Sequence, residues 1–140
     1  MGEDMVLTYQ VDPDDFTRAG EASSSLKRTL KQLGIPADII RRISIVMYEG
    51  EINMVIHAQG GEITVSITPE KIVMVLADVG PGIPDVELAM RAGYSTAPDA
   101  IRSLGFGAGM GLPNMKKYTD EMNIDTTVGV GTTITMVVNL

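Results

Sequence analysis

The 140-residue sequence contains no cysteine and no tryptophan, a single histidine, and aromatic residues at only 4% of its positions. The absence of cysteine excludes disulfides, iron–sulfur clusters, thiolate metal sites and thiol nucleophiles. No apolar run reaches the roughly 20 residues of a membrane-spanning helix, and the N-terminus lacks the basic and apolar segments of a signal peptide. The sequence therefore predicts a cytoplasmic protein with no membrane partner.

Basic residues are also few, since 11 lysines and arginines stand against 18 acidic residues and give a net charge of −7. An acidic chain without a run of lysine or arginine lacks the electrostatic footprint of a nucleic-acid-binding protein. The length suits one domain that buries a sizeable core without disulfides or metals. We therefore expect a single domain over residues 1–140 and no nucleic-acid partner.

The hydrophobic pattern predicts both strands and helices. We expect strands at Met5–Val11, Ile63–Thr68, Ile72–Asp78, Asn123–Val128 and Thr132–Asn139, and helices near residues 14–33, 36–58, 86–91 and 112–120. Asp14 or Asp15 would cap the first helix, and Pro36 would lie in the first turn of the second. The nearly continuous apolar character of Ile72–Asp78 indicates a central strand. The segment Ala92–Phe106 has no firm periodicity and is expected to be mobile.

The second predicted helix carries two polar residues on an apolar face. At 100° per residue, four branched aliphatic residues between positions 45 and 56 fall within roughly 60° of Glu49, and Asn53 follows one turn later. A carboxylate in such surroundings is costly unless it is paired. One interpretation is structural, with Arg42 as the partner of Glu49. The other is functional: Glu49 deprotonates a nucleophile, and Asn53 offers a neutral oxygen to Mg²⁺, which also takes phosphate and water ligands.

Asp78 ends the predicted central strand and precedes a turn with Gly80 and Gly82. Because the glycines add little bulk, the carboxylate would face a space that suits a flat base. A hydrogen bond accepted from an exocyclic amine would favour adenine over guanine. An equally good interpretation is an aspartate that caps a Gly-Pro turn.

Four of the seven residues from Gly105 to Gly111 are glycine, and a predicted helix follows at once. Glycine lets the backbone approach an anion closely, and the N–H groups of a helix's first turn point toward it. The pattern is typical of a phosphate-binding loop, but a purely structural loop would show it as well.

Taken together, four segments resemble the GHKL superfamily of ATPases, which gyrase, the Hsp90 chaperones, histidine kinases and MutL share. Residues 49–58 (EGEINMVIHA) resemble its N box, residues 78–83 (DVGPGI) and 105–112 (GFGAGMGL) its two glycine boxes, and residues 129–133 (GVGTT) its closing Gly-x-Gly-Thr element. The match covers about residues 35–140. Within the superfamily, the short length and residues 93–122 are most similar to bacterial anti-sigma-factor serine/threonine kinases and the stressosome switch kinase.

The resemblance implies a role for each matching residue. Glu49 would be the catalytic base, Asn53 the Mg²⁺ ligand and Asp78 the adenine contact, with Thr132 supporting the Asp78 end. Gly80 and Gly82 would shape the base pocket, and the phosphates would lie against Gly107, Ala108, Gly109, Met110, Gly111 and Leu112. Ala92–Gly105 would form the ATP lid.

Three residues depart from this pattern or complicate it. Gly50 and Ile52 put a helix-weakening residue and a bulky one inside the N box. Glu51 lies on the opposite face of the helix from Glu49, and a second acid so close leaves the identity of the base open.

The implied fold is a two-layer α/β sandwich of the Bergerat type, with helices over one face of a mixed, mostly antiparallel sheet. The implied activity is ATP–Mg²⁺-dependent phosphorylation of a serine or threonine on a small STAS-like antagonist protein, with ADP as the product, in a partner-switching circuit that includes a sigma factor or a phosphatase. One alternative is an ATP-binding anti-sigma or scaffold module without phosphotransfer. Another is a detached histidine-kinase catalytic domain. A homodimer is compatible with each.

Overall fold

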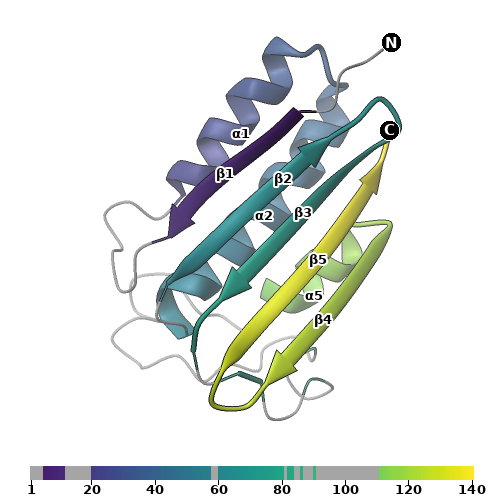
Figure 1. The fold of residues 1–140 in the computed structure, drawn as a ribbon. Coiled ribbons are helices and arrows are strands. Elements are labelled where there is room, and N and C mark those ends of the chain that lie inside the picture. The colour runs from purple at the N-terminus through teal and green to yellow at the C-terminus, as the bar shows by residue number, and fades with distance from the viewer. Residues whose placement is uncertain are drawn as a thin grey trace, which may run out of the picture.

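The computed structural model describes residues 5–11, 20–57, 60–80, 82, 83, 86, 90 and 111–140 (Figure 1). In chain order its elements are β1 (Met5–Val11), α1 (Glu21–Gln32), α2 (Ala37–His57), β2 (Gly61–Ile67), β3 (Lys71–Asp78), α5 (Gly111–Lys117), β4 (Glu121–Thr127) and β5 (Gly131–Asn139). None of the described helices combines the length and the apolar character that crossing a bilayer requires.

The strands form one five-stranded sheet in the order β1-β2-β3-β5-β4. Its centre is β3, which pairs with β2 and β5, so the prediction of a central strand at Ile72–Asp78 is confirmed. All pairings among the described strands are antiparallel. The expected, mostly antiparallel sheet is therefore confirmed, and this part of the chain contributes no parallel pair.

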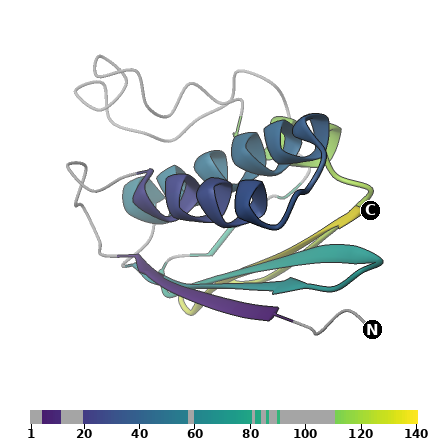
Figure 2. The same ribbon diagram turned by 90° about the horizontal axis from the view of Figure 1, so that it is seen from above.

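The helices lie together on one side of the sheet, which makes the molecule a two-layer sandwich (Figure 2). Alternate residues of the central strands are buried, as the period of a strand requires: Ile63, Val65, Ile67, Ile72, Met74 and Leu76. They form one hydrophobic cluster with the buried residues of the helices, among them Leu30, Ile43 and Met47. The predicted α/β sandwich is therefore confirmed.

The boundaries of several elements follow the sequence pattern, while two helices differ from it. The predicted helix at residues 36–58 and both hairpins are present with small shifts. The helix α1 begins at Glu21 after Gly20 and not at the predicted Asp14 or Asp15, which lie outside the described residues. The helix α5 ends at Lys117, three residues before the predicted end. Of the predicted helix at residues 86–91, the amide of Met90 donates to the carbonyl of Val86 at 3.0 Å, and the remainder lies outside the described residues.

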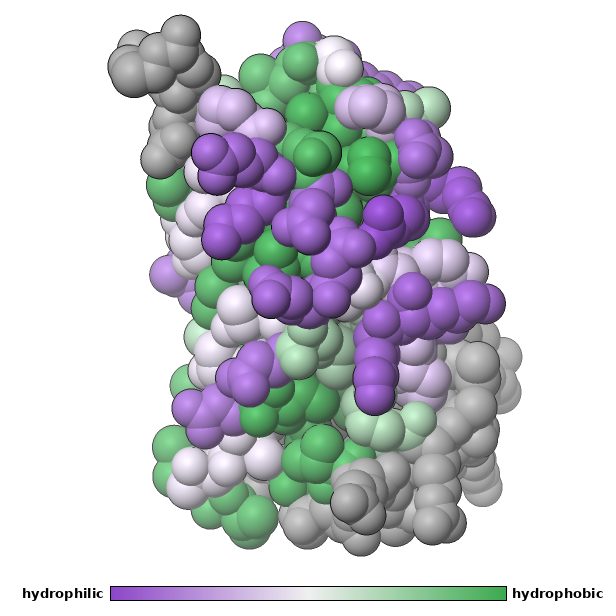
Figure 3. All heavy atoms as spheres, turned by 90° about the vertical axis from the view of Figure 1, so that its right-hand side faces the viewer, coloured by the Kyte–Doolittle hydropathy of each residue, from purple (hydrophilic) through white to green (hydrophobic). Residues whose placement is uncertain are grey.

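The edge strand β4 carries polar residues on its exposed face. Glu121, Asn123, Asp125 and Thr127 are exposed, and the residues between them are half-buried. Figure 3 views the molecule from this side and shows hydrophilic side chains gathered over the middle of the face. Charged residues on an edge strand disfavour pairing with a further strand.

Candidate functional site

Glu49 and Asn53 lie one turn apart on α2, and both side chains are half-buried. Their neighbours Val46 and Met54 are buried in the core at 0% and 2% exposure. The two polar residues therefore lie at the margin of the buried face. Each side chain is close to buried apolar residues in the helix and is still partly exposed to solvent. Within the part of the chain that the structure describes, Glu49 forms no hydrogen bond or ion pair.

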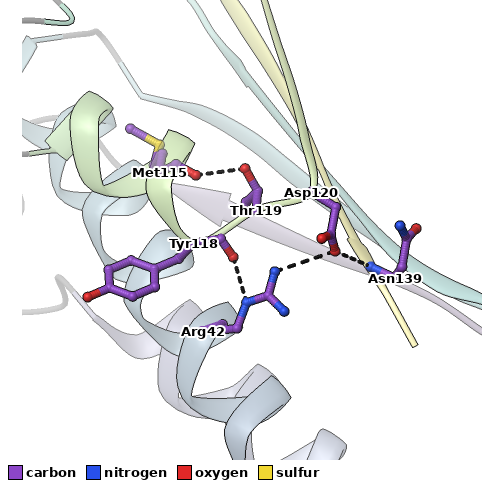
Figure 4. Close-up of polar contacts among 6 residues, drawn as sticks. All are labelled: Arg42, Met115, Tyr118, Thr119, Asp120 and Asn139. Carbon is purple, nitrogen blue, oxygen red and sulfur yellow. Dashed lines mark hydrogen bonds and ion pairs between the residues drawn. The ribbon is translucent and has the colours of Figure 1, made fainter.

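The structural interpretation of Glu49 required a pair with Arg42, and this pair is not formed. Arg42 Nε donates a hydrogen bond of 2.9 Å to the carbonyl of Tyr118, and its Nη2 lies 3.4 Å from Asp120 Oδ2 (Figure 4). Arg42 thus connects α2 to the segment between the end of α5 and the start of β4. The carboxylate of Glu49 stays available for another function.

Glu51, the second acid of this segment, has a structural role. It is 4% exposed, and its carboxylate accepts hydrogen bonds of 3.2 Å from the backbone amides of Ala22 and Ser23. The Ser23 hydroxyl adds a third contact at 3.0 Å. These donors belong to the first turn of α1, where a negative charge is favourable. Glu51 on the following helix, α2, therefore caps the N-terminus of α1. Its role is thus different from the one expected for Glu49.

Gly50 marks the place where α2 crosses the elements of the predicted nucleotide site. It is buried, and a Cβ at this position would overlap the side chain of Leu76 on β3 and lie 3.7 Å from Met115 Sδ on α5. A helix-weakening glycine inside α2 is thus explained by close packing. Because Leu76 precedes Asp78 by two residues, the crossing brings the Glu49 segment, the end of β3 and α5 to one region of the molecule (Figure 1).

Asp78 is half-buried at the end of β3. Its Oδ1 accepts a hydrogen bond of 2.9 Å from the backbone amide of Thr132, and no described residue bonds to Oδ2. Burial raises the pKa of Asp78, and the hydrogen bond from Thr132 opposes this rise. The carboxylate therefore keeps one oxygen for an outside donor, and Thr132 lies beside it.

A second threonine completes this part of the site, and the sequence analysis missed it. Thr126 Oγ1 lies 2.9 Å from Thr132 Oγ1, and it accepts a hydrogen bond of 2.9 Å from the amide of Ile83. The two threonines are opposite each other in the β4–β5 hairpin. Its register, counted back from the Gly129–Gly131 turn, would have pointed to Thr126.

The turn after Asp78 rests on the β4–β5 turn. The amide of Gly80 donates to the carbonyl of Val130 at 3.1 Å. Gly82 has a φ of +76°, and a Cβ there would lie 2.6 Å from the carbonyl oxygen of Thr127. The lack of a side chain at Gly82 thus allows backbone to approach backbone, and this contact together with the Gly80 hydrogen bond holds the turn beside Thr126 and Thr132.

Only the last two residues of the predicted phosphate-binding loop, Gly111 and Leu112, lie in the described part of the chain. Gly111 begins α5, and the side chain of Leu112 is 9% exposed and packs in the core. Leu112 would therefore face a phosphate through its backbone. Gly107, Ala108, Gly109 and Met110 lie outside the described residues, as does the predicted lid at Ala92–Gly105.

The residues present fit a Mg²⁺ site in which the protein supplies one ligand, Asn53. Within the described ranges, no group of three or more acids and histidines is arranged to hold a metal. Asn53 contributes a neutral amide oxygen at the margin of the core. One protein oxygen suffices for Mg²⁺ when nucleotide phosphates and water complete its coordination.

Comparison with known proteins agrees with this arrangement. The model of the family described as the histidine kinase-like ATPase domain matches residues 13–138. An anti-sigma F factor of Bacillus licheniformis is 32% identical over 111 residues, which cover 75% of this chain and 73% of the relative. The serine/threonine-protein kinase RsbT of Bacillus subtilis is 30% identical over 112 residues, or 77% of this chain and 78% of the relative.

A solved structure shows the same fold. The histidine kinase domain of a blue-light activated histidine kinase, EL346 of Erythrobacter litoralis, matches with a TM-score of 0.53 and 16% sequence identity. The match covers 87% of this chain and 61% of that chain. At this identity the likeness concerns the fold alone.

Proposed function

This chain belongs to the family of histidine kinase-like ATPase domains, and we propose that it is an ATP–Mg²⁺-dependent kinase that phosphorylates a serine or threonine of a small partner protein. The observation that carries the proposal is the packing of α2 on β3 and α5 at Gly50, which places one half-buried carboxylate on α2 beside this crossing and another at the end of β3. One of them, Asp78, has an oxygen free for a base. The other, Glu49, has no partner among the described residues.

Adenine recognition would rest on Asp78. Its Oδ2 would accept a hydrogen bond from the exocyclic amine of adenine, while Oδ1 stays fixed by the Thr132 amide. Guanine presents a carbonyl at that position, and the carboxylate would then be desolvated without a donor. The hydroxyls of Thr126 and Thr132, which lie 2.9 Å apart, would hold the wall of the pocket in one arrangement. ADP would bind through the same contacts.

Phosphoryl transfer would rest on Glu49. The hydroxyl oxygen of the partner forms a bond to the γ-phosphorus, the bond from that phosphorus to the β–γ bridging oxygen breaks, and ADP leaves. Glu49 accepts the proton of the hydroxyl. Asn53 would hold Mg²⁺, which neutralises charge on the phosphates. Backbone amides of residues 107–112 would add donors, and residues 92–105 would form the lid.

The relatives suggest the biological setting. They carry the names anti-sigma F factor and serine/threonine-protein kinase, so we propose a partner-switching circuit in the cytoplasm, where ATP is supplied. The substrate would be a small STAS-like antagonist, with a sigma factor or a phosphatase as a further partner. The name anti-sigma factor also favours a second candidate, an ATP-gated binding module without phosphotransfer.

Mass spectrometry of a co-purifying protein, incubated with this chain and ATP–Mg²⁺, tests the proposal. We expect one serine or threonine of that protein to gain a phosphate. A phosphohistidine would instead identify a detached histidine-kinase domain. Nucleotide binding without any phosphorylated residue would favour the binding module.

A further inference from the structure

The helices α1 and α2 lie side by side over the sheet (Figure 2). A groove of about 740 Å³ lies between them. Three exposed cations line it, Lys27 and Lys31 from α1 and Arg41 from α2. The Arg41 guanidinium lies 5.9 Å from the centre of the Tyr118 ring, which contributes to its position. None of the residues that line the groove in the described part of the chain is acidic.

The remaining lining of the groove is mostly apolar. Ile35 and Ile45 are half-buried, and Tyr48 is 41% exposed. A large aromatic residue that is exposed next to aliphatic residues is a typical anchor of a protein interface. A groove rimmed only by cations also contrasts with the net charge of −7 of the whole chain.

On α2 the groove is lined up to Tyr48, within one turn of the proposed catalytic carboxylate, which does not itself line the groove. Ile45 and Glu49 are four residues apart on α2 and therefore share one face of the helix. Tyr48 immediately precedes Glu49. A segment bound along α2 would thus end beside the place where the hydroxyl of a substrate has to arrive.

We propose that this groove docks an acidic amphipathic helix of the protein substrate. The apolar face of that helix packs on Ile35, Ile45 and Tyr48, and its aspartates and glutamates pair with Lys27, Lys31 and Arg41. The inference rests on the proposed function, because docking here delivers the substrate to Glu49. The concave shape between two helices fits a helix better than a flat membrane.

Site-specific photo-crosslinking in cells tests the docking. With p-benzoylphenylalanine in place of Tyr48, we expect capture of a partner segment that has acidic residues flanking an apolar helical stripe. In a Lys27→Glu/Lys31→Glu background, the yield of this product should fall by about tenfold. The matched control is Lys71→Glu, a charge reversal at an exposed residue of β3 outside the groove. It should leave the yield of the crosslinked product unchanged. The same crosslinker at Val6, which is 62% exposed on β1, should not capture that segment.

Four crosslinking results would each overturn the inference: no captured protein segment, a captured segment without acidic residues, a yield that does not respond to the double reversal, or crosslinks only to a second copy of this chain. Failure of the proposed function gives a different result, because the crosslink does not require phosphotransfer. If Tyr48 captures the acidic segment and no residue of that partner becomes phosphorylated by the wild-type chain, the docking stands and the kinase assignment fails. If phosphorylation occurs with unchanged KM in the double reversal, the kinase stands and the docking fails.

Discussion

Arg42 of α2 and Asp120, which precedes β4, form an ion pair with 3.4 Å between Nη2 and Oδ2. The same Oδ2 accepts a hydrogen bond of 2.7 Å from the amide of Asn139 on β5, and Arg42 Nε donates to the carbonyl of Tyr118 (Figure 4). Arg42 therefore ties α2 to the end of α5 and to the β4–β5 hairpin. Since α2 carries Glu49 and Asn53, this connection holds the proposed catalytic helix against α5.

We expect Arg42→Gln to lower the free energy of unfolding by about 1–2 kcal/mol, because it removes a charge-assisted hydrogen bond and an ion pair that is only partly exposed. Urea unfolding would measure the change. Arg28→Gln, on the exposed face of α1, is the control and should stay within about 0.5 kcal/mol of the wild type. Equal effects of the two substitutions would show that the connection contributes nothing.

The same substitution should affect different properties at the two acids of α2. At Glu51 it should lower the stability of the fold, and at Glu49 it should lower the kinase activity. Glu51→Gln is expected to lower the free energy of unfolding by about 2–3 kcal/mol, because a buried carboxylate that accepts three hydrogen bonds becomes a neutral amide with an NH₂ group facing donors. Glu49→Gln should change stability by less than about 0.5 kcal/mol, and phosphotransfer to the partner should fall by roughly 10²–10⁴-fold with nucleotide affinity almost unchanged. A stable Glu49→Gln protein with full activity would refute the catalytic role.

Nucleotide selectivity should depend on Asp78. We expect ATP and ADP with Mg²⁺ to raise the melting temperature and GTP to leave it unchanged, because a desolvated carboxylate without a donor costs roughly 1–3 kcal/mol. Asp78→Asn should weaken ATP binding sharply. Differential scanning fluorimetry with matched nucleotide concentrations checks both. The adenine assignment fails if ATP and GTP stabilise the protein equally.

The same residue should give stability a recognisable pH dependence. Burial raises the pKa of Asp78 above 3.8 in the folded state, so folding favours the protonated form. The contribution of Asp78 to the free energy of unfolding therefore falls as pH rises from about 3.8 through the folded pKa, and it is constant above that range. Asp78→Asn cannot ionise and still accepts from Thr132.

Relative to the wild type, this variant should therefore gain stability as pH rises from about 4 toward neutrality. Urea unfolding of both proteins across that range measures the gap. A gap that shrinks with rising pH would contradict the raised pKa.

Two glycines with almost identical φ angles allow the cost of backbone strain to be measured separately from the cost of a steric contact. Gly82 has a φ of +76° and lies against the backbone of Thr127, whereas Gly34 has a φ of +75° and no atom within 4 Å of the place where a Cβ would lie. Gly34→Ala should cost about 1–2 kcal/mol from left-handed backbone strain alone. Gly82→Ala should cost about 1–3 kcal/mol more, because backbone atoms must move apart. Equal losses in urea unfolding would mean that the contact with the β4–β5 turn is unimportant.

Short-range chemistry accounts for what the sequence determined by itself. Alternation and turn residues placed both hairpins and the central position of β3, and the helical period put Glu49 and Asn53 on one face of α2. Asp78 at the end of an apolar strand was visible for the same reason. Each of these features depends on residues within a few positions of one another, where the backbone period and the conformational preference of glycine or proline are decisive.

Which polar groups contact each other depends on how the elements pack in three dimensions. The start of α1 depends on Glu51, 29 residues from the amide of Ala22, and no local capping residue indicated it. The partner of Arg42 is Asp120, 78 residues away, although Glu49 lies two turns along the same helix. The need for glycine at position 50 arises from Leu76 on another element. Such contacts depend on how helix and sheet cross, and the local energies of the competing partners are too similar for the sequence to distinguish them.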